Sequence, residues 1–207
     1  MKALQFDRTG DLAALSFTEI ADPVPATDEV LVEVHAAGLN PSDVKNVLGR
    51  FPYTTLPRVP GRDLPARGER PDRAARQIRL GHRQGPGLTR NGSHAQLMSV
   101  PLGGVALMPE RMSFAQAASC GVPFTTAWDA LERSQVGKGT RLLVIGSGAV
   151  GAAAISLAKA RGAQVLGAVR RAESQVELQA QGIPSLLLDS AETLAAQVDE
   201  HFPGGAR

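Results

Sequence analysis

The 207-residue chain has a single cysteine, Cys120, so it can form neither an intramolecular disulfide nor a cysteine-rich zinc module. It has one tryptophan, one tyrosine and little excess of charge, because 22 Lys and Arg residues stand against 20 Asp and Glu residues. A net charge of +2 does not indicate a protein that binds nucleic acid or membranes over its whole surface. With 43% hydrophobic and 20% charged residues, the composition is typical of one or two globular domains.

The sequence also lacks a segment with the length and apolarity of a signal peptide or a membrane span. Residues 1–7 contain no apolar run. The most apolar stretch, residues 142–158, is interrupted by glycines and is followed closely by Lys159 and Arg161. Together with the lone cysteine, these features predict a soluble cytoplasmic protein.

From Thr140 onward, predicted strands alternate with predicted helices. Strands are predicted at residues 141–145, 164–169 and 185–188, and helices at residues 149–161, 172–181 and 191–200. This succession predicts a parallel sheet with right-handed crossovers, and hence an α/β fold. The first sixty residues differ: residues 29–36 alternate as a half-buried strand does, and Asp43 is expected to cap a short helix near Pro41.

A glycine-rich turn joins the strand at residues 141–145 to its helix. The turn consists of Gly146, Ser147, Gly148, Ala149, Val150 and Gly151, which match the pattern G-x-G-x-x-G. The first glycine permits the tight turn, the second lets the backbone approach a pyrophosphate, and the third lets helix and strand pack closely. Because a helix N-terminus adds unpaired N–H groups, we predict a dinucleotide site here; the alternative is a glycine-rich connection without a ligand.

The residues after the second strand, about 20 residues beyond the turn, select the cofactor. An NAD site carries an acidic residue there, whereas this chain has Val169-Arg170-Arg171 and no acidic residue before Glu173. Guanidinium groups suit a 2′-phosphate through charge-assisted, bidentate hydrogen bonds. We therefore predict NADP(H), with Arg170 or Arg171 as the selecting residue; the alternative is that one or both arginines are merely solvated.

Three further stretches follow one another in order: AGLNPSD at residues 37–43, LPRVPGRD at residues 56–63 and GVPFTTAW at residues 121–128. With the glycine turn, they resemble the medium-chain dehydrogenase/reductases, and among these the zinc-free quinone oxidoreductases related to zeta-crystallin. The resemblance implies a GroES-like β-barrel domain at residues 1–124 and a Rossmann domain at residues 125–207, with NADPH in the cleft between them. It leaves a homodimer open for a full-length protein.

The resemblance also bears on metal binding and on the substrate. Zinc-dependent relatives place a cysteine and a histidine where this chain has Asn40 and Arg62, and their structural cysteines are absent here. No histidine lies near another in the sequence, so we predict that the protein binds no metal. Without a Lewis acid, the substrate must itself be electrophilic, as a quinone or a conjugated enone is.

The same resemblance indicates the catalytic residues. It implies that Asn40 and Thr126 lie near the nicotinamide ring and its ribose, and that Tyr53 lies at the cleft. Each residue also has a structural interpretation, as a turn-forming asparagine, a threonine at a helix start and a half-buried tyrosine.

The resemblance breaks at residues 64–87. Within this segment, residues 65–87 carry Arg67, Arg70, Arg73, Arg76, Arg79 and Arg83 but only two large apolar residues, Ile78 and Leu80. Such a segment buries too little surface to offset the entropy of ordering, so we expect a disordered loop. It is either a stretch translated in a shifted frame or a genuine basic insertion that binds RNA. The absence of interleaved aromatic residues argues against RNA.

The chain ends before the fourth strand of a six-stranded Rossmann sheet, so we expect an incomplete Rossmann domain in a truncated protein. The predicted function is zinc-independent, NADPH-dependent reduction of quinones or conjugated enones. The alternatives are a catalytically inactive NADP-binding or crystallin-like structural fragment, and RNA binding through the arginine-rich segment.

Overall fold

The computed structural model describes residues 1–68, 75–79, 85–188 and 190–206. The chain divides into two compact units, Met1–Val122 and Pro123–Arg207. The division falls inside helix α3 (Gly121–Arg133), and the boundary predicted between residues 124 and 125 lies within the same helix.

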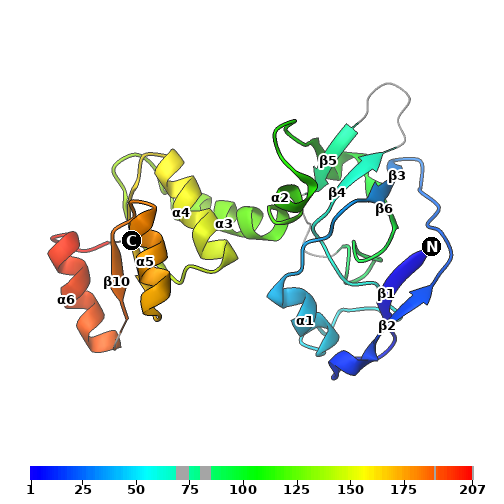
Figure 1. Ribbon diagram of the computed structural model, residues 1–207, viewed down its shortest axis with the longest axis horizontal. Coiled ribbons are helices and arrows are strands. Elements are labelled where there is room, and N and C mark those ends of the chain that lie inside the picture. The colour runs from blue at the N-terminus through cyan, green and yellow to red at the C-terminus, as the bar shows by residue number, and fades with distance from the viewer. Residues whose placement is uncertain (69–74, 80–84, 189, 207) are drawn as a thin grey trace. The chain divides into compact units, whose positions relative to one another are not determined.

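Antiparallel strands form the first unit (Figure 1). A two-stranded ribbon pairs β1 (Lys2–Phe6) with β2 (Leu15–Glu19), and the 3₁₀ turn η1 (Leu12–Ala14) joins them. A five-stranded sheet has the order β6-β3-β4-β5-β7. Its strands are β3 (Glu29–Val34), β4 (Pro65–Gly68), β5 (Ala75–Arg79), β6 (Leu97–Pro101) and β7 (Val105–Leu107).

Three short helical segments complete the first unit: α1 (Pro41–Val47), η2 (Leu102–Gly104) and α2 (Phe114–Ala118). The core lies against β3 and β6. It contains Val30 and Val32 of β3, which pack with Leu64 and with Met98 and Val100. The alternation predicted for residues 29–36 is therefore confirmed over Glu29–Val34.

Two stretches of the arginine-rich segment form strands. β4 pairs antiparallel with β3 and with β5, and β5 pairs with β7, so the sheet continues through this part of the chain. The expectation of a disordered loop is wrong for residues 65–68 and 75–79, because backbone pairing with neighbouring strands orders them, and composition does not reveal such pairing. The expectation for residues 69–74 and 80–84 falls outside the described residues.

The second unit is a parallel sheet with the strand order β10-β9-β8. Its strands are β8 (Arg141–Ile145), β9 (Gln164–Val169) and β10 (Ser185–Leu187). They alternate with α4 (Ala149–Ala160), α5 (Ala172–Ala180) and α6 (Ala191–His201). The predicted succession of strands and helices is confirmed.

The central strand, β9, is buried on both faces. Val165 and Val169 pack in a cluster with Ile155 of α4 and Leu178 of α5. Leu166 and Ala168 point the other way and pack in a cluster with Leu186 and Val198. Helices α4 and α5 therefore cover one face of the sheet and α6 covers the other, and Figure 1 shows β10 between α5 and α6.

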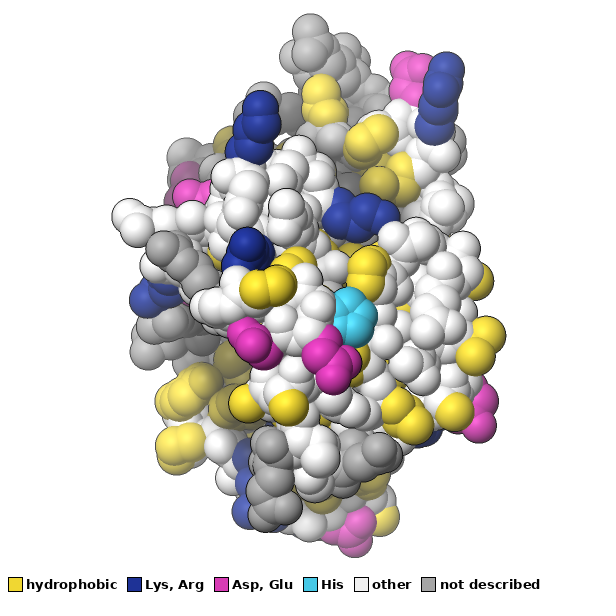
Figure 2. All heavy atoms as spheres, turned by 90° about the vertical axis from the view of Figure 1, so that its left-hand side faces the viewer, with side chains coloured by type: hydrophobic (Ala, Val, Ile, Leu, Met, Phe, Trp, Pro, Cys, Tyr) yellow, Lys and Arg dark blue, Asp and Glu magenta, His cyan; other side chains and the backbone are white. Residues whose placement is uncertain are grey.

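The surface carries charges of both signs. On the face that Figure 2 presents, basic, acidic and apolar side chains are interspersed, without a broad patch of one charge. Within the described ranges, no helix combines the length and the apolarity needed to cross a membrane.

Candidate dinucleotide site and buried polar network

The glycine turn lies between β8 and α4, as predicted. Gly146 has a φ of +96°, in the left-handed region that favours glycine. A Cβ built at Gly151 would lie 2.0 Å from the carbonyl oxygen of Gly146, so only glycine fits there without a backbone shift. A Cβ built at Gly148 would meet no atom within 4 Å, so the backbone there faces open space. The turn thus has the geometry of a phosphate-binding turn, and phosphate binding itself stays a prediction.

The start of α4 suits an anion. Gly148 is the N-cap residue and offers no side chain to the N–H groups of the first helical turn, which begins at Ala149. No acidic residue occupies this turn either. Unpaired N–H groups and the positive end of the helix dipole both favour a phosphate at this place.

A pocket of about 420 Å³ lies at the carboxyl ends of β8 and β9. Its lining includes Gly146, Ser147, Gly148, Arg170, Arg171 and Ser174. The structure therefore brings the glycine turn and both predicted arginines to one pocket, at the end of the sheet where open parallel sheets bind ligands. Another pocket, of about 380 Å³, lies at the amino end of β9 beside Val165, Ile183 and His201, where this rule predicts no ligand.

The exposure of the residues changes abruptly where β9 ends. Val169 is 3% exposed, whereas Arg170 and Arg171 are both exposed. Arg171 is the N-cap residue of α5, and its Nη2 donates a hydrogen bond of 3.2 Å to Ser174 Oγ. Ser174 is not among the residues predicted from the sequence, where its only signal is its position three residues after the second arginine.

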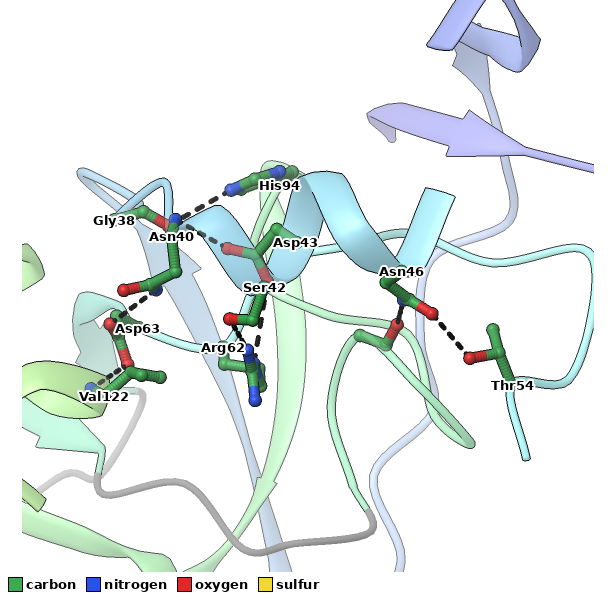
Figure 3. Close-up of polar contacts among 11 residues, drawn as sticks. Gly38, Asn40, Ser42, Asp43, Asn46, Thr54, Arg62, Asp63, His94 and Val122 are labelled. Carbon is green, nitrogen blue, oxygen red and sulfur yellow. Dashed lines mark hydrogen bonds and ion pairs between the residues drawn. The ribbon is translucent and has the colours of Figure 1, made fainter. Parts of the chain in front are cut away.

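In the first unit, Asn40 lies at the start of α1 (Figure 3). Its Nδ2 donates to Asp63 Oδ2 at 2.9 Å, and its backbone N–H donates to Asp43 Oδ2 at 2.8 Å. Asp43 therefore caps the helix, as predicted. The buried amide of Asn40 has a structural role here, and its place near a nicotinamide stays a prediction.

Asp63 links two elements of the first unit. Its side chain is almost fully buried, and Oδ1 accepts a hydrogen bond of 2.8 Å from the backbone N–H of Val122, at the start of α3. Burial raises the pKa of the Asp63 carboxyl, although the hydrogen bonds from Asn40 and Val122 act in the opposite direction. Asp63 belongs to one of the motifs in the sequence, but this role cannot be predicted there, because burial depends on tertiary packing.

The positions that correspond to zinc ligands do not fit a metal. The guanidinium of Arg62 is a cation, hydrogen-bonded to Ser42 and 3.6 Å from Asp43 Oδ1. The amide of Asn40 donates to Asp63. His94 lies nearby, but its Nε2 is 3.3 Å from the carbonyl oxygen of Gly38. Across the part of the chain that the structure describes, no group of three His, Cys, Asp or Glu side chains could hold a metal ion.

The three predicted catalytic residues are divided between the two units. Tyr53 is 42% exposed, and its ring centroid lies 5.8 Å from that of Phe51. Thr126 is exposed on α3 and belongs to the second unit, whereas Asn40 and Tyr53 belong to the first. Among the described contacts, none joins Asn40, Tyr53 and Thr126, so their catalytic roles stay predictions.

Part of the chain matches a known family model. Residues 26–110 match the alcohol dehydrogenase GroES-like domain.

Three curated proteins illustrate what the chain is similar to. It is 38% identical over 159 residues to a zinc-type alcohol dehydrogenase-like protein of Schizosaccharomyces pombe, a match covering 74% of this chain and 48% of that protein. It is 35% identical over 161 residues to the quinone oxidoreductase of Homo sapiens, a match that covers 76% of this chain and 49% of that protein. It is 34% identical over 173 residues to a chloroplastic NADPH-dependent alkenal/one oxidoreductase of Arabidopsis thaliana, a match that covers 77% of this chain and 44% of that protein. The chain spans about half the length of the curated relatives it matches.

Solved structures match nearly the whole chain. An alcohol dehydrogenase superfamily protein from Novosphingobium aromaticivorans matches with a TM-score of 0.88 and 28% identity, over 99% of this chain and 63% of that one. The quinone oxidoreductase of Thermus thermophilus, also solved in complex with NADPH, matches with a TM-score of 0.81 and 30% identity, over 97% of this chain and 63% of that one.

Replacing Gly151 by alanine should destabilise the second unit, whereas the same change at Gly148 should not. The new Cβ at 151 would overlap a backbone oxygen, and such overpacking costs about 1–3 kcal/mol. At Gly148, where φ is −65° and the space is open, we expect a change within about 0.5 kcal/mol. Urea unfolding of the two variants measures the difference. A Gly151→Ala variant as stable as the wild type would contradict the close packing.

Asp63→Ala should lower the free energy of unfolding, because it removes the carboxylate that accepts hydrogen bonds from the buried amide of Asn40 and from the N–H of Val122. An unpaired buried donor costs about 1–3 kcal/mol. Asp28→Ala is the control, since that side chain is exposed and should change stability by less than about 0.5 kcal/mol.

The effect of Asp63→Ala should also depend on pH. Because the pKa of Asp63 is raised above 3.8 in the folded protein, the stabilisation from its protonation is fully present below pH 3.8 and is lost as the pH rises through the folded pKa. The gap in unfolding free energy between wild type and Asp63→Ala should therefore narrow as the pH rises. A gap that widens with pH would show that the pKa is lowered instead.

Proposed function

We propose that this chain belongs to the medium-chain dehydrogenase/reductase family, whose GroES-like domain its residues 26–110 match, and that it is an NADPH-dependent reductase of quinones or conjugated enones. The observation that carries the proposal is the pocket at the ends of β8 and β9, where the glycine turn meets Arg170 and Arg171. A dinucleotide with a 2′-phosphate is the ligand that matches both parts of this pocket.

The residues of the second unit would bind and orient the cofactor. The backbone at Gly148 and the N-terminus of α4 would hold the pyrophosphate, and an arginine would hold the 2′-phosphate. When bound, NADPH supplies a hydride. We propose that Asn40, Tyr53 and Thr126 orient the nicotinamide and the substrate, on the basis of the family resemblance alone.

The substrate class follows from the side chains at the positions that correspond to zinc ligands. An amide at Asn40 and a guanidinium at Arg62 cannot replace a thiolate and an imidazole as metal ligands. Quinones and conjugated enones accept a hydride without a metal to polarise them, since their own carbonyl groups withdraw the electrons. The names of the human and Arabidopsis relatives, a quinone oxidoreductase and an alkenal/one oxidoreductase, support this class.

Two alternatives to the reductase function can be tested by experiment. A catalytically inactive NADP-binding or crystallin-like protein would have the same pocket without turnover. RNA binding through the arginine-rich segment has no structural observation in its favour, because Arg70, Arg73 and Arg83 fall outside the described residues.

The chain should bind 2′,5′-ADP more tightly than 5′-AMP. A charge-assisted contact to the extra phosphate is worth about 1.5–3 kcal/mol, which is roughly tenfold or more in affinity. Replacing both Arg170 and Arg171 by alanine should remove the preference and leave 5′-AMP binding nearly unchanged. Isothermal titration calorimetry gives both dissociation constants. Equal affinities in the wild type would rule out the NADP assignment but not the dinucleotide fold.

Activity is tested by mixing the purified chain with NADPH and 1,4-benzoquinone or an enone, and following the loss of NADPH absorbance. We expect oxidation that depends on the added acceptor, is faster with NADPH than with NADH and persists after chelator treatment. The Arg170→Ala/Arg171→Ala variant serves as the control and should lose the preference for NADPH. If NADPH binds but no acceptor is reduced, the protein is the inactive alternative.

A further inference from the structure

The two arginines beyond β9 differ in what holds them. Arg171 is the N-cap residue of α5, and its Nη2 donates to Ser174 Oγ at 3.2 Å. Within the described residues, no hydrogen bond or ion pair holds the side chain of Arg170. Both side chains are exposed and both line the pocket, so neighbouring bonds, rather than burial, distinguish them.

Ser174 is a fixed acceptor for Arg171. It is 4% exposed, lines the same pocket and occupies the third position of α5. A serine side chain has one rotatable bond to its oxygen, so the helix backbone largely determines where Oγ lies. The guanidinium that binds this oxygen is therefore held beside the pocket.

The position of α5 is itself held by hydrogen bonds to β10. Gln175 Nε2 donates to the carbonyl oxygen of Ser185 at 2.9 Å, and Ser185 Oγ donates to the carbonyl oxygen of Gln175 at 3.4 Å. These bonds attach the first turn of α5 to the sheet. They also use the side chain of Gln175, which does not line the pocket.

Holding Arg171 in place favours anion binding. A guanidinium has five N–H donors, and the bond to Ser174 uses one of them, so four remain for phosphate oxygens. A side chain that is already held in position loses less rotamer entropy when it binds. Arg170 has the same charge, but nothing described holds its side chain in one conformation.

We infer that Arg171 is the residue that binds the 2′-phosphate, and that Ser174 is the positioning residue that holds Arg171 beside the pocket. Arg170 then contributes a nearby positive charge without a fixed contact. The inference rests on the proposed NADP binding and deepens it, because it assigns the choice of cofactor to one arginine and one serine.

The test measures the preference, defined as the dissociation constant for 5′-AMP divided by that for 2′,5′-ADP, on the chain as it exists. Arg171→Ala should reduce the preference to near one, whereas Arg170→Ala should keep most of it. Ser174→Ala should reduce the preference by about threefold to tenfold, as expected for loss of one hydrogen bond, with 5′-AMP affinity unchanged. Ser174→Thr retains the hydroxyl group and should retain the preference.

Two further variants separate positioning from a general structural effect. In the Arg171→Ala background, Ser174→Ala should cause no further loss, because the serine acts through that arginine. Ser185→Ala is the matched control: Ser185 is also buried and bonded to α5, but it does not line the pocket, so the preference should stay at the wild-type value.

The outcomes distinguish the inference from the function on which it rests. Equal affinities for the two ligands in the wild type would overturn both. A wild-type preference that survives Ser174→Ala or Arg171→Ala, or that disappears in Arg170→Ala, would overturn the inference alone. If Ser174→Ala no longer binds 5′-AMP, the comparison of Arg170→Ala with Arg171→Ala still decides which arginine binds the phosphate.

Discussion

Strand β9 must bury both of its faces, and this requirement places the other elements of the second unit. Val165 and Val169 require α4 and α5 on one side, and Leu166 and Ala168 require α6 on the other. The crossover through α4 makes β8 and β9 a parallel pair, so the carboxyl ends of the two strands lie at the same end of the sheet. The glycine turn and the arginines meet because each follows one of these two strand ends, so the candidate site is a consequence of how the sheet is covered.

Much of the second unit could be predicted from the sequence, because the determining signals are local. Apolar runs of four and five residues indicate β8 and β9, and the glycine spacing locates the turn with its open backbone at Gly148. Strands β4 and β5 could not be predicted in the same way. Their order comes from pairing with β3 and β7, which are distant in the sequence, and their arginine-rich composition indicates the opposite.

The side chains of the candidate site could likewise be predicted only where a local sequence signal marks them. Arg170 and Arg171 were identified from their distance to the turn, since their role needs only a position after a strand. Ser174 and Asp63 were not, because a serine or an aspartate has no distinctive pattern until its burial and partners are known. That Asn40 and Arg62 stand where zinc-dependent relatives place ligands follows from the family resemblance, whereas the contacts that these two residues make are known only from the structure.

The apolar core of the second unit ends at Val169, one residue before the arginines. The residues proposed to choose between cofactors are therefore exposed, whereas residues that maintain the fold are buried in β9. Substitutions at Arg170 and Arg171 are therefore expected to cost little stability. If these two residues select the cofactor as proposed, the preference is free to diverge during evolution, or to be redesigned, without repacking of the interior.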